Sequence, residues 1–130
     1  MVFSARVKAA ISIHSYGNVL IMPWGYDDIA HEKAQQMTRM AYKMVNAIKW
    51  GTKDRELYVP GTAYQVFDRW GFAGGATDDW YSSLGITFSY TWELPGQDLD
   101  YTYRGFKLPP KNIIRVGFPR ISMSIDISAM

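Results

Sequence analysis

Two residues that could take part in acid–base or metal chemistry stand at the ends of strand-like segments. His14 ends the segment 7–14 and Glu93 lies near the end of the segment 86–94, each on the face that carries small polar residues. Taken singly, a lone histidine is usually structural and a glutamate at a strand end is usually solvated. Because imidazole is the commonest metal ligand and glutamate a frequent general base, the pair is more suggestive than either residue alone.

The elements that would position this pair alternate between strands and helices. The continuous apolar run 18–23 predicts a strand buried on both faces. Three- and four-residue steps predict an amphipathic helix over 27–50, with Gly51 as its cap. Extended structure with a Pro-Gly turn is predicted over 56–67, and a short helix over 78–84. This alternation predicts the α/β class, in which the carboxyl ends of strands are the usual place for a site.

Composition limits the classes of function. The 130 residues suffice for one domain, and the 48% apolar content suffices for a core. A net charge of +2 without a basic run argues against a nucleic-acid partner, and no apolar stretch reaches the 18 or so residues of a membrane span. The charged N-terminal segment does not have the pattern of a signal peptide. His31, between Ala30 and Glu32, is predicted to be a solvent-facing helical residue, and the aromatic residues show no common face.

Five segments give the chain a specific likeness to a known family. In order, they are ISIHSYG, PWGY, GGATDDW, ITFSYTWELP and GFKLPP. From about residue 6 to residue 114 the chain resembles the C-terminal part of the catalytic domain of zinc metallocarboxypeptidases, in the carboxypeptidase A/B subfamily. The resemblance implies a three-layer α/β/α fold with a mixed, mostly parallel sheet. Residues 1–130 would be the C-terminal portion of one catalytic domain, and 115–130 an atypical tail.

The resemblance also implies roles for individual residues. His14 matches the third zinc ligand of a set of two histidines and one glutamate that leaves a position for water, as known from carboxypeptidase A. Glu93 matches the general base that takes a proton from that water. Tyr16 and Phe106 match aromatic residues that line the groove for the substrate, which is the C-terminus of a peptide or protein.

Asp78 bears on substrate preference. Counted back from Glu93, it falls where the family places the floor of the pocket for the terminal side chain. An aspartate there would select C-terminal Lys or Arg by charge pairing. A simpler explanation stays open, because an acid is favoured in the first turn of a helix over 78–84 in any case.

Several family features have no counterpart in this sequence. The other two zinc ligands form a His-x-x-Glu motif upstream of the third ligand in the family, and no such motif is present. Nor can the mobile tyrosine near the Gly-Gly loop be assigned. We therefore expect an incomplete sheet, an upstream half of the domain outside this sequence, and no activity from the isolated chain. The family suggests an extracellular protein. A non-catalytic scaffold or binding module on the same fold is the alternative.

Overall fold

A four-stranded mixed sheet forms the centre of the molecule. The computed structural model describes residues 7–53, 57–67, 71–96 and 105–110. The strands are β1 (Ala9–Ser15), β2 (Val19–Ile21), β3 (Val59–Gly61) and β4 (Phe88–Leu94), in the spatial order β1-β4-β2-β3. The pairs β1–β4 and β2–β3 are parallel, whereas β2 and β4 run antiparallel. The predicted mixed, mostly parallel sheet is confirmed.

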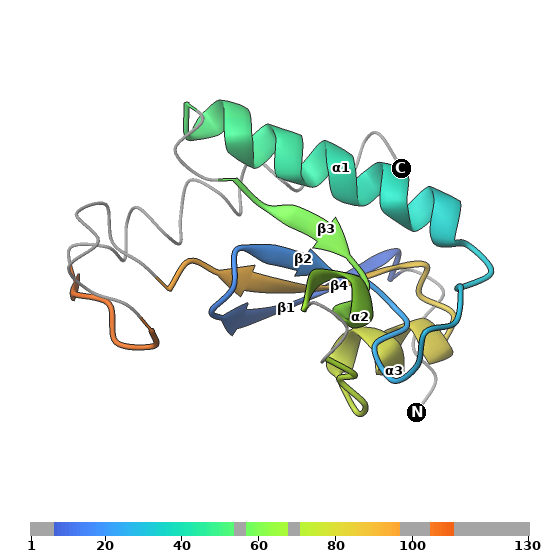
Figure 1. The fold of residues 1–130 in the computed structure, drawn as a ribbon. Helices are drawn as coiled ribbons and strands as arrows, with labels where there is room; N and C mark the ends of the chain where they lie inside the picture. The colour runs from blue at the N-terminus through green and yellow to red at the C-terminus, as the bar shows by residue number, and fades with distance from the viewer. Residues whose placement is uncertain (1–6, 54–56, 68–70, 97–104, 111–130) are drawn as a thin grey trace.

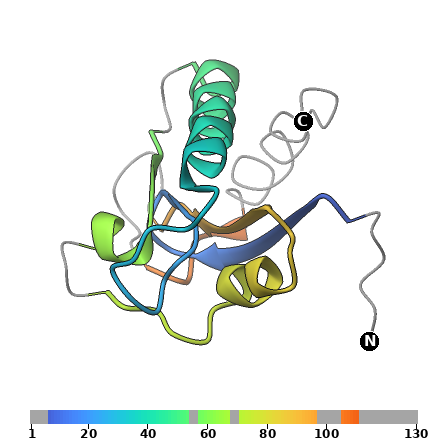
Figure 2. The same ribbon diagram turned by 90° about the vertical axis from the view of Figure 1, so that its right-hand side faces the viewer.

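Helices cover both faces of this sheet. The long helix α1 (Ala34–Gly51) lies over one face, and the short helices α2 (Ala63–Val66) and α3 (Thr77–Ser83) lie on the other (Figures 1 and 2). This arrangement is the predicted α/β/α layering. The strands β1 and β3 form the two open edges of the four-stranded sheet. None of the helices in the described ranges is long and apolar enough to cross a membrane.

The main core lies between α1 and the sheet. Apolar side chains from the inner face of α1 pack there on side chains from β2, β4 and the adjoining chain. The buried residues of this core are Leu20, Met22, Met37, Met40, Ala41, Met44, Val45, Ile48, Tyr58, Tyr90 and Trp92. The two faces of β4 divide as the alternation predicted, because Tyr90 and Trp92 point to α1 whereas Ser89 and Thr91 bond to Asp78 of α3.

The predicted start of the long helix was wrong by seven residues. Residues 27–33 form a loop, because polar side chains there bond to nearby backbone amides instead of leaving them to a helix. The amide of Asp28 donates to Asp27 Oδ1 at 2.8 Å, and the amide of Lys33 donates to the ring of His31 at 2.9 Å. At the other end Gly51 is helical, and Thr52 caps the helix by donating its hydroxyl to the carbonyl of Ile48.

The segment 57–67 also differs from its prediction. Pro60 and Gly61 do not form a turn, since they belong to the edge strand β3, where a proline without an amide proton is tolerated. The helix α2 follows directly. Its first turn is closed by a capping box in which the Thr62 hydroxyl accepts from the Gln65 amide and the Gln65 side chain accepts from the Thr62 amide. The atypical tail 115–130 lies outside the described residues.

Candidate active site

His14 and Glu93 meet at one rim of the sheet. Because β1 and β4 are parallel and in register, the two residues are direct neighbours across the strands. Nδ1 of His14 lies 2.9 Å from Oε1 of Glu93. The imidazole side chain is 65% exposed and the carboxylate only 10%, so the histidine faces outward while the glutamate is held beneath it. The second carboxylate oxygen, Oε2, is buried without a hydrogen-bond partner among the described residues.

A cavity of about 270 Å³ opens next to this pair. It lies on the side of the sheet opposite α1. Its lining residues come from β1, β2, β4, the start of α3 and the loops after β2, after α2 and before α3: Ser12, His14, Ile21, Gly25, Phe67, Ala73, Ala76, Thr77, Asp78, Thr91 and Glu93. The walls are mostly apolar, with a few polar groups that converge on the space. Such a cavity is the usual form of a small-ligand site.

Asp78 is the buried acid of this cavity. It lies in the first turn of α3 and is 1% exposed. Oδ1 accepts a hydrogen bond from the Thr91 hydroxyl at 2.9 Å, whereas Oδ2 has no hydrogen-bond partner in the described part of the chain. Burial raises the pKa of Asp78, and the bond from Thr91 opposes that rise only in part. A cation entering the cavity would supply the partner that Oδ2 lacks.

Asp79, which the sequence analysis did not single out, fixes one wall of the cavity. Its carboxylate accepts from the amides of Gly25 at 2.9 Å and Tyr26 at 3.2 Å. The Gly25 carbonyl in turn accepts from the Ala73 amide at 2.7 Å. These bonds tie the loop after β2 to α3 and to the Gly-rich loop. Burial raises the pKa of Asp79, although the two amide bonds work in the opposite direction.

Tyr16 and Phe106 form an exposed aromatic pair beyond the end of β1. Their rings meet edge to face with centroids 5.0 Å apart. The Tyr16 side chain packs directly on the backbone of Gly96, which follows β4. Only glycine fits at this position, because any Cβ there would overlap the tyrosine ring. The Gly17 amide donates to the Leu94 carbonyl, which keeps this segment beside the end of β4. Phe106 is 74% exposed, so its ring is available to a ligand.

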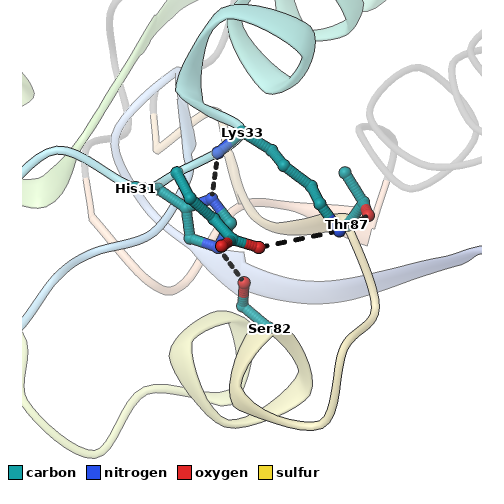
Figure 3. Close-up of polar contacts among 5 residues, drawn as sticks. His31, Lys33, Ser82 and Thr87 are labelled. Atoms are coloured by element: carbon teal, nitrogen blue, oxygen red, sulfur yellow. Dashed lines mark hydrogen bonds and ion pairs between the residues drawn. The ribbon is translucent and has the colours of Figure 1, made fainter.

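His31 is buried, and its predicted surface position was wrong. Only 8% of the residue is exposed, and its ring lies between the start of α1 and α3 (Figure 3). Nδ1 accepts from the Lys33 amide, so Nε2 carries the proton and donates to the Ser82 hydroxyl at 2.9 Å. A tilted contact with Trp24 completes its surroundings. The residues next to His31 in the sequence could not reveal this, because its burial depends on the packing of the loop before α1 against Ser82 of α3.

The surroundings of His31 predict acid-sensitive stability. Burial lowers the pKa of His31 below 6.5, so the unfolded chain takes up a proton at a higher pH than the folded one. The free energy of unfolding should therefore fall as the pH drops below about 6.5. In His31→Asn the amide oxygen can still accept from Lys33, while the Ser82 bond is lost. This variant should be less stable by about 1 kcal/mol at pH 7.

Urea unfolding of the unsubstituted chain and of His31→Asn at several pH values between 7.5 and 5 tests this prediction. At each pH, the free energy of unfolding of the variant is subtracted from that of the unsubstituted chain. This removes the contributions of the carboxyl groups, which are common to both. The difference in stability should shrink as the pH falls. A constant difference would show that His31 does not titrate on unfolding.

Comparisons with known proteins bear directly on this site. The family model described as zinc carboxypeptidase matches residues 2–118. That span is most of the chain. The chain belongs to the zinc carboxypeptidase family. The earlier resemblance, drawn from five short segments, is thereby confirmed.

Individual relatives support the same assignment. Mouse carboxypeptidase A1 is 37% identical over 111 residues, which are 84% of this chain and 24% of the mouse protein. Carboxypeptidase B of Helicoverpa zea is 30% identical over 113 residues, 86% of this chain and 25% of that protein. The chain thus spans about a quarter of the length of these zinc carboxypeptidases.

Solved carboxypeptidase structures share the fold. Carboxypeptidase A of Helicoverpa armigera superposes with a TM-score of 0.78 at 26% identity, over 92% of this chain and 28% of that one. Bovine thrombin-activatable fibrinolysis inhibitor, in complex with tick carboxypeptidase inhibitor, gives a TM-score of 0.70 at 30% identity, over 90% and 36%. The open-edged α/β sheet is therefore a piece of the carboxypeptidase architecture.

Proposed function

We propose that this chain is the C-terminal portion of a zinc carboxypeptidase catalytic domain that releases single residues from the C-termini of peptides and proteins. The observation that carries the proposal is the 2.9 Å contact between His14 and Glu93 at the mouth of the cavity that contains Asp78. These groups come from segments up to 79 residues apart, and together they provide a ligand, a base and a side-chain pocket.

The residues present fit part of a zinc site. An exposed imidazole at the mouth of a cavity suits a divalent cation, and the carboxylate beside it suits a base for the water that such a cation would hold. Within the described residues no group of three His, Cys, Asp or Glu side chains could hold a metal. We infer that His14 is one ligand and that the remaining two come from elsewhere in the whole protein. Zinc bound there would acidify a water molecule and polarise the carbonyl of the substrate.

Glu93 is suited to move the protons of the reaction. As a carboxylate, it accepts the proton of the water that attacks the substrate carbonyl, and it then donates that proton to the amine that leaves. Both transfers need the same oxygen to stay in place. The parallel register of β1 and β4 and the burial of the Glu93 side chain hold it there.

The cavity would receive the terminal side chain of the substrate. Asp78 lies within it with one unpartnered oxygen, so a Lys or Arg side chain would form an ion pair away from bulk water. This favours basic C-terminal residues over apolar ones. Tyr16 and Phe106 would line the groove for the preceding residues, because both rings are exposed at the same rim. On the family resemblance, we expect the whole protein to act outside the cell.

A non-catalytic member of the family is the second candidate. The described residues offer one zinc-ligating histidine rather than a full set, which is what a scaffold or binding module could also show. The two candidates differ in metal content. A catalytic member binds one zinc per molecule once the whole domain is assembled, whereas a scaffold does not.

Zinc content in a hybrid enzyme tests the proposal. The hybrid carries the segment of this chain that aligns with mouse carboxypeptidase A1, in place of the matched 111 residues of that protein. We expect one equivalent of zinc and release of C-terminal residues from short peptides. The 130-residue chain alone should bind far less than one equivalent. His14→Gln should remove zinc from the hybrid, while Glu32→Gln, at an exposed position outside the site, should not. Full zinc content in His14→Gln would overturn the assignment.

A further inference from the structure

An aromatic residue lines the cavity that contains Asp78. Phe67 follows α2 directly, belongs to the wall of the cavity and is 37% exposed. Among the described residues that line the cavity, it is the one Phe, Tyr or Trp. An aromatic ring at this place is not needed for zinc, for proton transfer or for pairing a charge with Asp78. Its effect on what the cavity binds is therefore a separate question.

Contacts with residues before and after it in the sequence hold Phe67 in place. The Phe67 amide donates to the carbonyl of Ala63 at 3.1 Å, and Ala63 is buried against Val19 and Ile21 of β2. A Cβ at Gly71 would lie 2.6 Å from Cβ and 2.9 Å from Cδ2 of Phe67, so the glycine backbone packs directly on this side chain. A side chain that is already held in one position loses little conformational freedom when a ligand packs on it.

The cavity is suited to a cation that gives up most of its water. Asp78 and Glu93 are acidic, and the described lining residues include no Lys or Arg. Oδ2 of Asp78 has no hydrogen-bond partner among the described residues. Because most of the other walls are apolar, few groups there can replace the water that an entering cation loses. A guanidinium is more weakly hydrated than an ammonium, so its transfer into such a cavity costs less free energy.

The ring of Phe67 adds to the same preference. A planar guanidinium stacks on aromatic faces, whereas an ammonium is a compact charge on a flexible stem. Cation–π attraction acts within about 6 Å of a ring centroid. Phe67 and Asp78 line one cavity of about 270 Å³, so a single bound side chain has access to both. One face of a guanidinium can therefore lie against the ring while an N–H group at its edge donates to Asp78.

We propose that Phe67 is a specificity-determining residue that makes the cavity prefer a C-terminal arginine to a C-terminal lysine. The guanidinium lies against the Phe67 ring and pairs its charge with Asp78. The inference rests on the proposed function, because it concerns the cavity that receives the terminal side chain of the substrate. Asp78 by itself does not make this choice, since a carboxylate pairs with either basic side chain.

Binding of two small cations to the 130-residue chain tests the proposal without a peptidase reaction. The probes are n-propylguanidinium and n-butylammonium, which reproduce the side chains of arginine and lysine. NMR titrations that follow the backbone amides of Ala76 and Thr91 should give a Kd about three- to fivefold lower for propylguanidinium. In Phe67→Leu, which keeps an apolar side chain but not the ring, the two Kd values should become equal.

A matched control and the contrary outcomes complete this test. Tyr42→Leu removes a half-exposed ring from α1, on the other face of the sheet, and should leave the difference between the two cations unchanged (Figure 1). Equal binding of the two cations by the unsubstituted chain would overturn the proposal. So would an unchanged difference in Phe67→Leu, or a failure of the chain to bind either cation.

Peptide cleavage by the hybrid enzyme gives an independent readout. In Phe67→Leu, kcat/KM for an Arg-terminated peptide should fall about three- to fivefold, while the value for the matching Lys-terminated peptide should change less than twofold. Equal losses for the two peptides would mean that Phe67 only supports the fold of the cavity, and would overturn the proposal. A hybrid that cleaves neither peptide would contradict the proposed function. The cation titrations need neither zinc nor cleavage, so they would still decide the role of Phe67.

Discussion

Replacing Glu93 with glutamine should reduce kcat of the hybrid enzyme by about 10²–10⁴, the range lost when a positioned general base is removed. Glutamine has nearly the same shape, and its oxygen can still face His14 across the β1–β4 pair. It cannot take the proton from the attacking water. The effect should therefore fall on kcat, with KM for a peptide substrate changed much less.

Zinc analysis separates this loss from a loss of metal. Glu93→Gln should retain one equivalent of zinc, because the proposed role of Glu93 is proton transfer and not metal binding. The exposed acid Glu32 provides a matched control, and Glu32→Gln should keep both zinc and activity. An unchanged kcat in Glu93→Gln would show that another group serves as the base.

Asp78→Asn should abolish the preference for basic C-terminal residues. The carboxylate is buried and one of its oxygens lacks a partner among the described residues, so a bound Lys or Arg would form its ion pair there. Truncating one partner of a buried charge pair typically costs about 3–5 kcal/mol. We expect kcat/KM for Lys- and Arg-terminated peptides to fall by at least 10²-fold. The value for a Phe-terminated peptide should stay within a few-fold.

The same substitution should stabilise the protein. The raised pKa of Asp78 means that the folded state holds its proton to a higher pH than the unfolded state. The free energy of unfolding therefore falls as the pH rises and the buried Asp78 loses its proton. Asparagine carries no charge at any of these pH values, so the variant does not show this fall. The gain should be on the order of 1 kcal/mol at pH 7 and should vanish near pH 3.

Asp28, an exposed acid in the loop before α1, supplies the control for both measurements. Asp28→Asn should change neither the specificity ratio nor the pH dependence of unfolding. Retained preference for Lys and Arg in Asp78→Asn would contradict the pocket assignment. It would leave Asp78 with the simpler role of an acid in the first turn of α3.

Local periodicity predicted most of the framework. The alternation over 86–94 identified both faces of β4, and the three- and four-residue steps identified the buried face of α1. Errors arose where side chains bond to nearby backbone. Thr62 and Gln65 form a capping box whose pattern is readable in the sequence, yet the neighbouring Pro-Gly pair suggested a turn instead. Thr91 could also have been found, since it stands two residues before Glu93 on the same face of β4.

By itself, the sequence determined which segments around His14 and Glu93 are strands, which helix face is apolar and which family the segments resemble. These properties depend on neighbours within a few positions, so the chain carries them locally. Only the tertiary structure decided that His14 stands opposite Glu93, that Asp78 enters the same cavity and that His31 is buried. Such contacts join residues 51 to 79 positions apart. They depend on strand order and helix packing, which no local pattern specifies.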